Sequence, residues 1–387
     1  MGYMNTIYLF FEKTMDDLMM KKVLLIMLAI VLMLSLAACK TSNQVAEEPA
    51  TEMPVTDEPA TTEKTSAEID LDDPLMEGKT GQEAPPKKLD KITIGFCPTA
   101  MNTQYQMVID GMKQCIYDNG WSDVIEFIVQ APTGQSAIDE QVEIVEGWIQ
   151  QEFDVICMCT ANEDALEPVY REATELGIPI FEFNTPALDI TNPYYVSNVG
   201  YDQREAGYAI GEWVCANFKD ELNVAILEGL PGTHNTERLG GFMDAIKDCG
   251  GTNINIVASQ PADWVRDKGQ TVTENLLVSN PEIQLIWGMY DEMALGAVAA
   301  CKDAGREDII IVGYDNTPDA NDSIRRGEMY ATVDTASKQM GYSLCEAVYQ
   351  YCIKGEMVPK TINQDVAVYD VNNIEDFALD NYTYVEK

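Results

Sequence analysis

Between residues 254 and 315, short apolar runs alternate with segments of helical length, and this alternation constrains the fold more than any other feature. The β-branched runs cover 254–258, 283–287 and 309–312, the helical segments 268–278 and 292–304, and the loops after the runs 260–264, 288–294 and 312–315. This β-α-β-α-β order predicts a parallel sheet. Because ligands of such sheets bind where strands end and loops begin, we expect Trp264, Tyr290 and Asp315 along one edge.

The same alternation extends from Lys91 onward. We expect further strands at 92–97, 125–129, 155–159, 178–183, 195–199, 223–227 and 330–333, and helices at 105–119, 136–151, 164–176 and 204–218. Two such series predict an α/β fold of two doubly wound parallel-sheet lobes with a cleft between their strand ends. A length of 387 residues with 46% hydrophobic content is sufficient for two cores of this kind.

The chain is strongly acidic. Lysine and arginine total 25 residues, against 64 aspartates and glutamates, which gives a formal net charge of -39. Binding to the phosphate backbone of nucleic acids requires clustered positive side chains, which this composition does not favour. We therefore expect no nucleic-acid partner, and we interpret the acidity as a source of solubility.

The first 38 residues have the features of a signal peptide, although acidic residues precede its basic part. Met19-Met20-Lys21-Lys22 leads into an apolar run at 23–34, so translation is expected to start at Met19 or Met20. Leu36-Ala37-Ala38-Cys39 resembles the bacterial lipobox, which implies lipidation of Cys39 and anchoring to the outer face of the cell membrane. The alternative is an uncleaved anchor, but the run is short for a membrane span, which needs about 20 residues.

Residues 39–90 join this anchor to the folded region. Thr, Pro, Glu, Ala and Asp dominate the segment, and it lacks a sustained apolar period. Such a composition cannot bury enough apolar surface to offset the entropy of ordering, so we expect a disordered tether.

The ten cysteines are scattered along the chain. Cys157 and Cys159 lie one residue apart in an apolar run, a spacing that suits neither an ordinary disulfide nor a metal site. We expect most of the cysteines after Cys39 to be buried thiols, because cysteine packs well as a small apolar side chain.

Three motifs of the folded region resemble those of the ribose-binding type of periplasmic binding protein, the type I sugar receptors of bacterial ABC importers. They are ASQPADW at 258–264, DEMALGA at 291–297 and GYDNTPD at 313–319, and the likeness extends from about Lys91 to Val368. No helix-turn-helix segment precedes Lys91, so the related repressors do not fit. The resemblance implies a monomer that binds a monosaccharide or polyol and presents it to a membrane permease.

The resemblance also implies three crossings between the lobes, which we place near Asp202, Thr335 and Asp365. The N-terminal lobe would then comprise residues 91–201 and 336–364, and the C-terminal lobe residues 203–334 and 365–387. Closure about these hinges would bury the ligand, and the closed form would be recognised by the permease.

Sugars require fixed polar groups for their hydroxyls and aromatic rings for their C–H faces. The resemblance assigns ligand-binding positions to residues from both lobes: Asn102, Gln104, Tyr105, Asn184, Thr185, Arg238, Trp264, Tyr290, Asp315 and Thr335. Asn102, Tyr105, Arg238, Trp264 and Asp315 match the character of the family's residues, whereas Gln104, Asn184, Thr185, Tyr290 and Thr335 depart from it. These departures predict a polyhydroxylated ligand other than ribose.

Several assignments have a structural alternative. Trp264 and Tyr290 could be core aromatics, and Asn102 could hold its own loop. Arg238 could pair with Glu237 or Asp244, and Asp315 could cap a helix that begins after Pro318. The single histidine, His234, is expected in a turn that it lines or supports.

An enzymatic function has little support in the sequence, which offers no Ser-His-acid set, no clustered metal ligands and no nucleotide-binding glycine motif. We therefore expect neither catalysis nor a cofactor. The alternative to import is sensing, in which the same fold would serve as the receptor partner of a membrane kinase or chemoreceptor.

Overall fold

The computed structural model describes residues 88–387 except 161, 186–191, 383 and 385–387. The expected signal peptide, Cys39 and nearly all of the tether lie outside the described residues. None of the described helices combines the length and hydropathy needed to span a bilayer.

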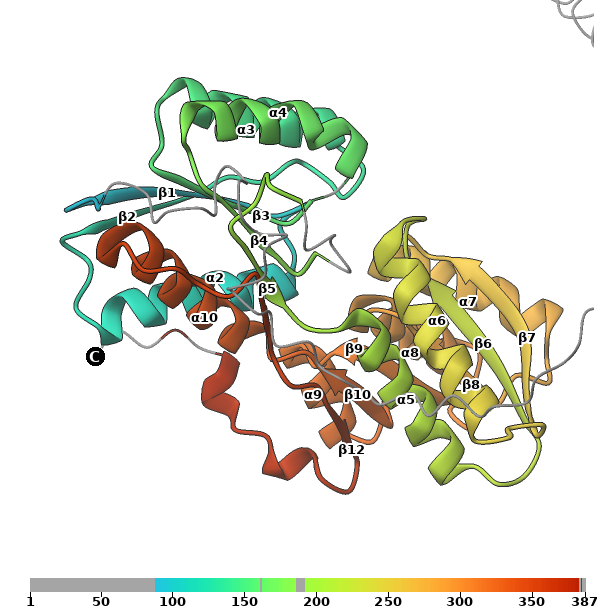
Figure 1. The fold of residues 1–387 in the computed structure, drawn as a ribbon. Helices are drawn as coiled ribbons and strands as arrows, with labels where there is room; N and C mark the ends of the chain where they lie inside the picture. Colours follow the sequence, from blue (N-terminus) through green and yellow to red (C-terminus); the bar gives the residue numbers. More distant parts are fainter. Residues whose placement is uncertain (1–87, 161, 186–191, 383, 385–387) are drawn as a thin grey trace, which may run out of the picture. The chain divides into compact units, whose positions relative to one another are not determined.

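The first sheet has six strands in the order β11-β5-β4-β3-β1-β2. Its strands are β1 (Ile92–Cys97), β2 (Ile125–Val129), β3 (Val155–Met158), β4 (Ile180–Phe183), β5 (Ser197–Gly200) and β11 (Thr361–Asn363). Helices α3 (Ile138–Gln150) and α4 (Glu163–Leu176) cover one face, and α2 (Thr103–Asp118) and α10 (Ser337–Tyr349) cover the other (Figure 1). We refer to this sheet with its helices as the N-terminal lobe.

The second sheet also has six strands, in the order β12-β10-β9-β8-β6-β7. They are β6 (Leu222–Glu228), β7 (Ile254–Pro261), β8 (Leu285–Gly288), β9 (Ile310–Asp315), β10 (Ala331–Asp334) and β12 (Ala367–Asp370). Its helices are α5 (Gln203–Asn217), α6 (Thr233–Asp248), α7 (Arg266–Ser279), α8 (Asp291–Asp303) and α9 (Pro318–Arg325), and α5 packs on α6 while α7 packs on α8. We refer to this unit as the C-terminal lobe.

The strands of both sheets are almost all parallel, and the central ones are buried. In both sheets the described strands pair in parallel, except that β12 is antiparallel to β10. The central strands β3, β4 and β8 are buried along their whole length, as expected for parallel strands covered on both faces. The predicted α/β fold with two parallel-sheet lobes is therefore confirmed.

The chain passes from one sheet to the other after β5, β10 and β11. At the first passage, Asp202 caps α5 by accepting hydrogen bonds from the backbone N–H groups of Arg204 and Glu205. Thr335 follows β10 at the second passage, and Asp365 lies between β11 and β12 at the third. Motion about these three positions remains a prediction.

Three local expectations were wrong. The expected loop at 260–264 begins as strand, since β7 continues to Pro261; β7 is an outer strand, where a proline costs no ladder hydrogen bond. The expected loop at 312–315 is also strand, because β9 pairs with β10 as far as Asp315. His234 lies in the first turn of α6 instead of an isolated turn.

Cysteine burial agrees with expectation, with one exception. Seven cysteines of the described chain are free and buried. Cys215 of α5 and Cys249, which follows α6, form a disulfide with a Cα–Cα distance of 6.5 Å. This bond was not predicted.

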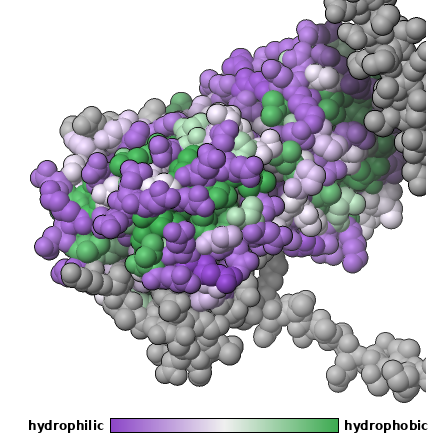
Figure 2. Space-filling view, turned by 90° about the horizontal axis from the view of Figure 1, so that it is seen from above, coloured by the Kyte–Doolittle hydropathy of each residue, from purple (hydrophilic) through white to green (hydrophobic). Residues whose placement is uncertain are grey.

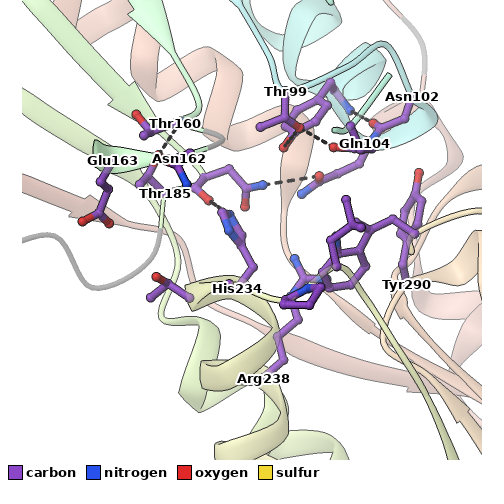
Figure 3. A pocket seen from close by; sticks show the side chains of 18 of the residues that line it. Thr99, Asn102, Gln104, Thr160, Asn162, Glu163, Thr185, His234, Arg238 and Tyr290 are labelled. Carbon is purple, nitrogen blue, oxygen red and sulfur yellow. Dashed lines mark hydrogen bonds between the residues drawn. The ribbon is translucent and has the colours of Figure 1, made fainter. Parts of the chain in front are cut away.

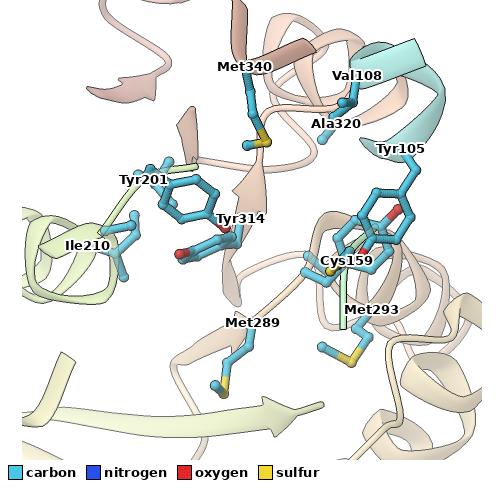
Figure 4. Packing of buried hydrophobic residues seen from close by; sticks show 14 of the residues in the cluster. Tyr105, Val108, Cys159, Tyr201, Ile210, Met289, Met293, Tyr314, Ala320 and Met340 are labelled. Atoms are coloured by element: carbon cyan, nitrogen blue, oxygen red, sulfur yellow. Dashed lines mark hydrogen bonds between the residues drawn. The ribbon is translucent and has the colours of Figure 1, made fainter. Parts of the chain in front are cut away.

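The main core continues from the sheets to the region between them (Figure 4). Tyr201 and Tyr314 lie beside each other there, with ring centroids 6.3 Å apart. On the face drawn in Figure 2, hydrophilic residues surround smaller apolar areas. The two lobes thus meet through buried aromatic residues close to the three passages.

Candidate functional site

A cavity of about 280 Å³ is lined by residues of both lobes. Nine of the ten predicted ligand-binding residues line it, namely Asn102, Gln104, Tyr105, Asn184, Thr185, Arg238, Trp264, Tyr290 and Asp315. In Figure 3, Thr160, Asn162, Glu163 and Thr185 lie at one end, and Asn102, Gln104 and Tyr290 lie at the other. The volume is just below the roughly 300–1,000 Å³ of most small-molecule sites, which favours a small ligand.

The start of α2 supplies three residues of the N-terminal lobe. Asn102 is the N-cap, and its Oδ1 accepts a hydrogen bond from the backbone N–H of Tyr105 at 2.8 Å. Asn102 therefore holds its own loop, as the structural alternative proposed, and it also lines the cavity. The Tyr105 hydroxyl lies 3.2 Å from Oγ1 of Thr99 and 3.3 Å from Sγ of Cys159.

Two aromatic residues of the C-terminal lobe also line the cavity. Trp264 follows β7 with a φ of 64°, and Tyr290 precedes α8. Close packing of the indole requires a glycine nearby, because a methyl group on Gly229 would lie 1.8 Å from Cζ2 of Trp264. Both rings pack against the core and also line the cavity, so burial does not exclude ligand contact.

Arg238 projects from α6 and is 4% exposed. Its Nε donates to Oε1 of Gln203 at 2.7 Å, and its two terminal nitrogens donate to the backbone oxygen of Met289 and the hydroxyl of Tyr201. The guanidinium carbon lies 3.9 Å from the ring centroid of Tyr314.

The two acidic residues considered as alternative partners of Arg238 form ion pairs with another arginine. The carboxylates of Glu237 and Asp244 pair with Arg204, an exposed residue of α5. The pairing alternative for Arg238 is therefore wrong, and its guanidinium is held toward the cavity by neutral acceptors.

Asp315 ends β9 with a φ of 101° and lines the cavity. Burial raises the pKa of its carboxyl to about 6, although the nearby Arg238 and a hydrogen bond from Thr335 oppose the shift. Asp315 does not cap α9; the carboxylate of Asp291 accepts the backbone N–H of Thr317 there, at 2.6 Å.

Thr335 is the one predicted ligand-binding residue that does not line the cavity. Its hydroxyl donates to Oδ1 of Asp315 at 3.1 Å, and it is fully buried. Its expected contact with the ligand therefore stays a prediction, while its side chain bonds a residue that does line the cavity.

Asn184 and Thr185 follow β4 at the other side of the cavity. Thr185 donates to Oε2 of the buried Glu182 at 2.6 Å, and Thr160 donates to Oε1 of the same carboxyl at 2.8 Å. Burial raises the pKa of Glu182 to about 8, even though both threonine hydroxyls lower it. This carboxyl positions the two threonines that line the cavity.

Sequence reasoning did not assign ligand contact to several cavity residues, including Thr99, Gln135, Thr160, Asn162, Glu163, Asp164 and His234. Nε2 of His234 lies 2.8 Å from the backbone oxygen of Asn184, which can only accept, so Nε2 carries the proton. Burial, together with Arg238, lowers the pKa of His234 to about 4. The imidazole is therefore neutral near pH 7.

A second hydrogen bond also joins the lobes beside the cavity. Thr103, the first residue of α2, donates to Oε1 of Glu292 in α8 at 3.3 Å. It adds to the bond between His234 and Asn184, which also joins the lobes. The described residues contain no group of His, Cys, Asp and Glu side chains suited to holding a metal ion.

The cavity combines amides, hydroxyls, one guanidinium, one imidazole and three carboxyl groups with the rings of two tyrosines and a tryptophan. Such a set can satisfy the hydroxyls of a small polar ligand and pack against its C–H groups. Recognition of this kind requires no reacting group.

Comparison with known proteins gives the family. Residues 94–357 match the family model described as "Periplasmic binding protein domain". The ribose import binding protein of Bacillus subtilis is 31% identical over 274 residues, which cover 70% of this chain and 85% of the relative.

Solved structures agree with this match. A periplasmic solute-binding protein of an ABC transporter from Actinobacillus succinogenes, with bound D-allose, has a TM-score of 0.67 and 28% identity, covering 74% of this chain and 100% of that chain. A solute-binding protein from Bacillus halodurans, with bound myo-inositol, has a TM-score of 0.66 and 25% identity, covering 76% and 97%. The chain therefore belongs to the type I periplasmic binding proteins, the sugar-binding proteins of bacterial ABC importers.

Proposed function

We propose that this protein captures a monosaccharide or related polyol in the cavity between its lobes and delivers it to an ABC permease. The observation that carries the proposal is the cavity itself, in which both lobes contribute polar groups and aromatic rings to one small space. A ligand that bridges such a space stabilises the closed arrangement of the lobes. The permease would recognise the closed arrangement.

The roles of individual residues follow from their chemistry. Tyr105, Trp264 and Tyr290 would pack against the C–H groups of the sugar, while Arg238 and Asp315 would bond its hydroxyls. Asp202, Thr335 and Asp365 would be the hinges, because they lie where the chain passes between the sheets.

We further propose a ligand other than ribose. Gln104 and Tyr290 replace an aromatic and an asparagine in the ribose receptors that the sequence resembles, and both line the cavity. Structurally similar proteins include one with bound D-allose and one with bound myo-inositol, so hexoses and cyclitols are the first ligands to test.

The protein would act as a monomer outside the cytoplasm, anchored to the cell membrane through lipidated Cys39. The lipobox-like sequence Leu36-Ala37-Ala38-Cys39 supports this location. Mass spectrometry of the protein from a bacterial host would test it, since a lipidated N-terminal cysteine has a diagnostic mass and Cys39→Ala would release the protein from membranes.

The alternative function is sensing for a membrane kinase or chemoreceptor, which would use the same cavity. Neighbouring genes distinguish the two roles. A cassette ATPase and a permease beside the gene favour import, whereas a histidine kinase favours sensing.

The test of sugar binding is a melting-temperature panel on protein that has been unfolded and refolded to remove bound ligand. Pentoses, hexoses, deoxysugars and cyclitols would be compared with amino acids as negative controls. A ligand at 1,000 times its Kd adds about 4 kcal/mol to the free energy of unfolding, which shifts the melt by several degrees.

A pair of variants connects the result to the cavity. Trp264→Ala should abolish the ligand-induced shift. Trp121→Ala should lower the melting temperature but preserve the ligand-induced shift, because Trp121 stacks on Tyr349 away from the cavity. If no sugar or polyol shifts the melt, the proposed function is wrong.

A further inference from the structure

Three side-chain amides connect Arg238 to the far wall of the cavity. Arg238 bonds Gln203, Gln203 bonds Asn184, and Asn184 bonds Gln104. The chain of bonds begins in α6, passes the first connection between the lobes and ends in α2. We call these three amides, Gln203, Asn184 and Gln104, the amide relay.

The direction of the relay is fixed at Gln203. A guanidinium has donors only, so the group that receives Nε of Arg238 at 2.7 Å must be the carbonyl oxygen Oε1 of Gln203. The hydroxyl of Tyr201 donates to the same oxygen at 3.1 Å, because its own oxygen already accepts from Arg238. The NH₂ group of Gln203 is therefore turned away from Arg238, toward Asn184.

Each amide of the relay donates a hydrogen bond to the carbonyl oxygen of the next amide. Nε2 of Gln203 donates to Oδ1 of Asn184 at 3.1 Å, which leaves the NH₂ group of Asn184 to donate to Oε1 of Gln104 at 3.5 Å. A rotated amide at either position would bring two donors together. The carbonyl of Gln104 is thus committed to the relay, and its NH₂ group is left over.

That NH₂ group is the unsatisfied end. Gln104 lines the cavity and is 3% exposed, and its Nε2 has no hydrogen-bond partner among the described residues. Tyr290, at the same end of the cavity in Figure 3, is also buried. Buried donors without partners are costly, so a bound molecule that accepts hydrogen bonds there would remove the cost.

We propose that Gln203 is a positioning residue that fixes Gln104 as an obligate donor to the ligand, so that the cavity selects a sugar or polyol with an oxygen acceptor at this point. The proposal rests on the proposed sugar-binding function and adds its specificity. Hydroxyl oxygens and ring oxygens fit, because both accept a hydrogen bond. An ammonium or an apolar group at this point leaves Gln104 unpaired.

Gln203→Glu tests the orientation without any ligand. A carboxylate keeps the bond to Arg238 but offers Asn184 only acceptors, so the amides of Asn184 and Gln104 should both rotate. The side-chain amide signal of Gln104, assigned by its loss in Gln104→Met, should move in the ¹⁵N-edited NMR spectrum of Gln203→Glu, because its NH₂ group then donates to Asn184. An unmoved Gln104 signal would overturn the relay.

A double-mutant cycle tests whether the relay acts on the ligand. Calorimetry with D-ribose, D-allose, D-galactose, D-fructose and myo-inositol identifies the probes that bind the unchanged protein. For these, Gln203→Glu and Gln104→Met should each weaken binding about tenfold, the effect of one lost hydrogen bond to a buried group.

The double variant should bind no more than about threefold more weakly than Gln104→Met alone, since both changes act through one group. Losses that multiply would mean that Gln203 acts independently of Gln104, which contradicts the proposal. Gln106→Met, on the exposed side of α2, is the matched control and should change nothing. If no probe binds the unchanged protein, the proposed function fails, while the NMR spectrum still decides the orientation.

Discussion

Nε2 of His234, in the C-terminal lobe, lies 2.8 Å from the backbone oxygen of Asn184, in the N-terminal lobe. Asn184 is also the middle member of the amide relay, and its φ of 53° is one that asparagine tolerates better than most residues. One residue of the N-terminal lobe therefore receives a backbone bond and a side-chain bond from the other side. The two contacts hold the lobes together beside the cavity.

We predict that closure weakens in acid because of His234. Its pKa is about 4 in this arrangement and near 6.5 when solvated, so the closed form disfavours the imidazolium. The stabilisation is complete above pH 6.5 and is lost as the pH falls from 6.5 toward 4. Calorimetry at several pH values should show sugar affinity falling across this window.

His234→Gln is the matched variant for this effect, because glutamine can donate to the Asn184 carbonyl and does not titrate. Its affinity should vary less between pH 6.5 and 4 than that of the unchanged protein. Asp315, whose pKa is about 6, titrates in both proteins and accounts for the pH dependence of affinity that remains in His234→Gln. Identical pH profiles would show that His234 is not the group responsible.

Glu182 has the opposite pH dependence. Its pKa is raised from 4.5 to about 8, so the folded state binds more protons than the unfolded state between these values. Its contribution to stability is present below pH 4.5 and is lost as the pH rises through 8. Glu182→Gln should therefore gain melting temperature relative to the unchanged protein as the pH rises from 5 to 9.

Differential scanning calorimetry of both proteins at pH 5 and pH 9 measures this effect. Glu175→Gln, on the exposed surface of α4, controls for the general loss of a negative charge. A constant difference in melting temperature between Glu182→Gln and the unchanged protein would rule out a titrating carboxyl.

The sheets could be predicted from the sequence because their signal is local. Buried strands such as β1 and β8 are short apolar runs. The helices between strands have apolar residues that repeat at helical spacing. β11 and β12 were not predicted, since they are short and largely unburied. Their pairing depends on where the chain has already placed β5 and β10.

The site was predictable where one residue type suffices for its role, as for Trp264 or Arg238. Gln203 was not found, because its role depends on an arginine 35 residues away and an asparagine 19 residues away. Sequence position also does not show that Thr335 bonds Asp315 and does not itself line the cavity. Such relations appear only when distant segments are packed.

Reduction of the disulfide should lower the stability of the fold. Cys215 and Cys249 are 34 residues apart, and closing a loop of this length stabilises a fold by roughly 3–4 kcal/mol in the chain-entropy model. Cys215→Ser combined with Cys249→Ser should lower the melting temperature, and dithiothreitol should lower that of the unchanged protein only. Equal effects of dithiothreitol on both proteins would show that the bond is absent in solution.

Gly229 should control the position of the indole in the cavity wall. A methyl group there would lie 1.8 Å from Cζ2 of Trp264, closer than any tolerated contact, so Gly229→Ala must displace the ring. Because Trp264 lines the cavity, sugar affinity should fall by tenfold or more, the effect of losing about 1.4 kcal/mol of ring packing. Gly134→Ala is the matched control, since a methyl group on Gly134 meets nothing within 4 Å. Calorimetry on the two variants separates the outcomes: if Gly229→Ala binds sugar as tightly as Gly134→Ala, the position of the Trp264 ring does not determine affinity.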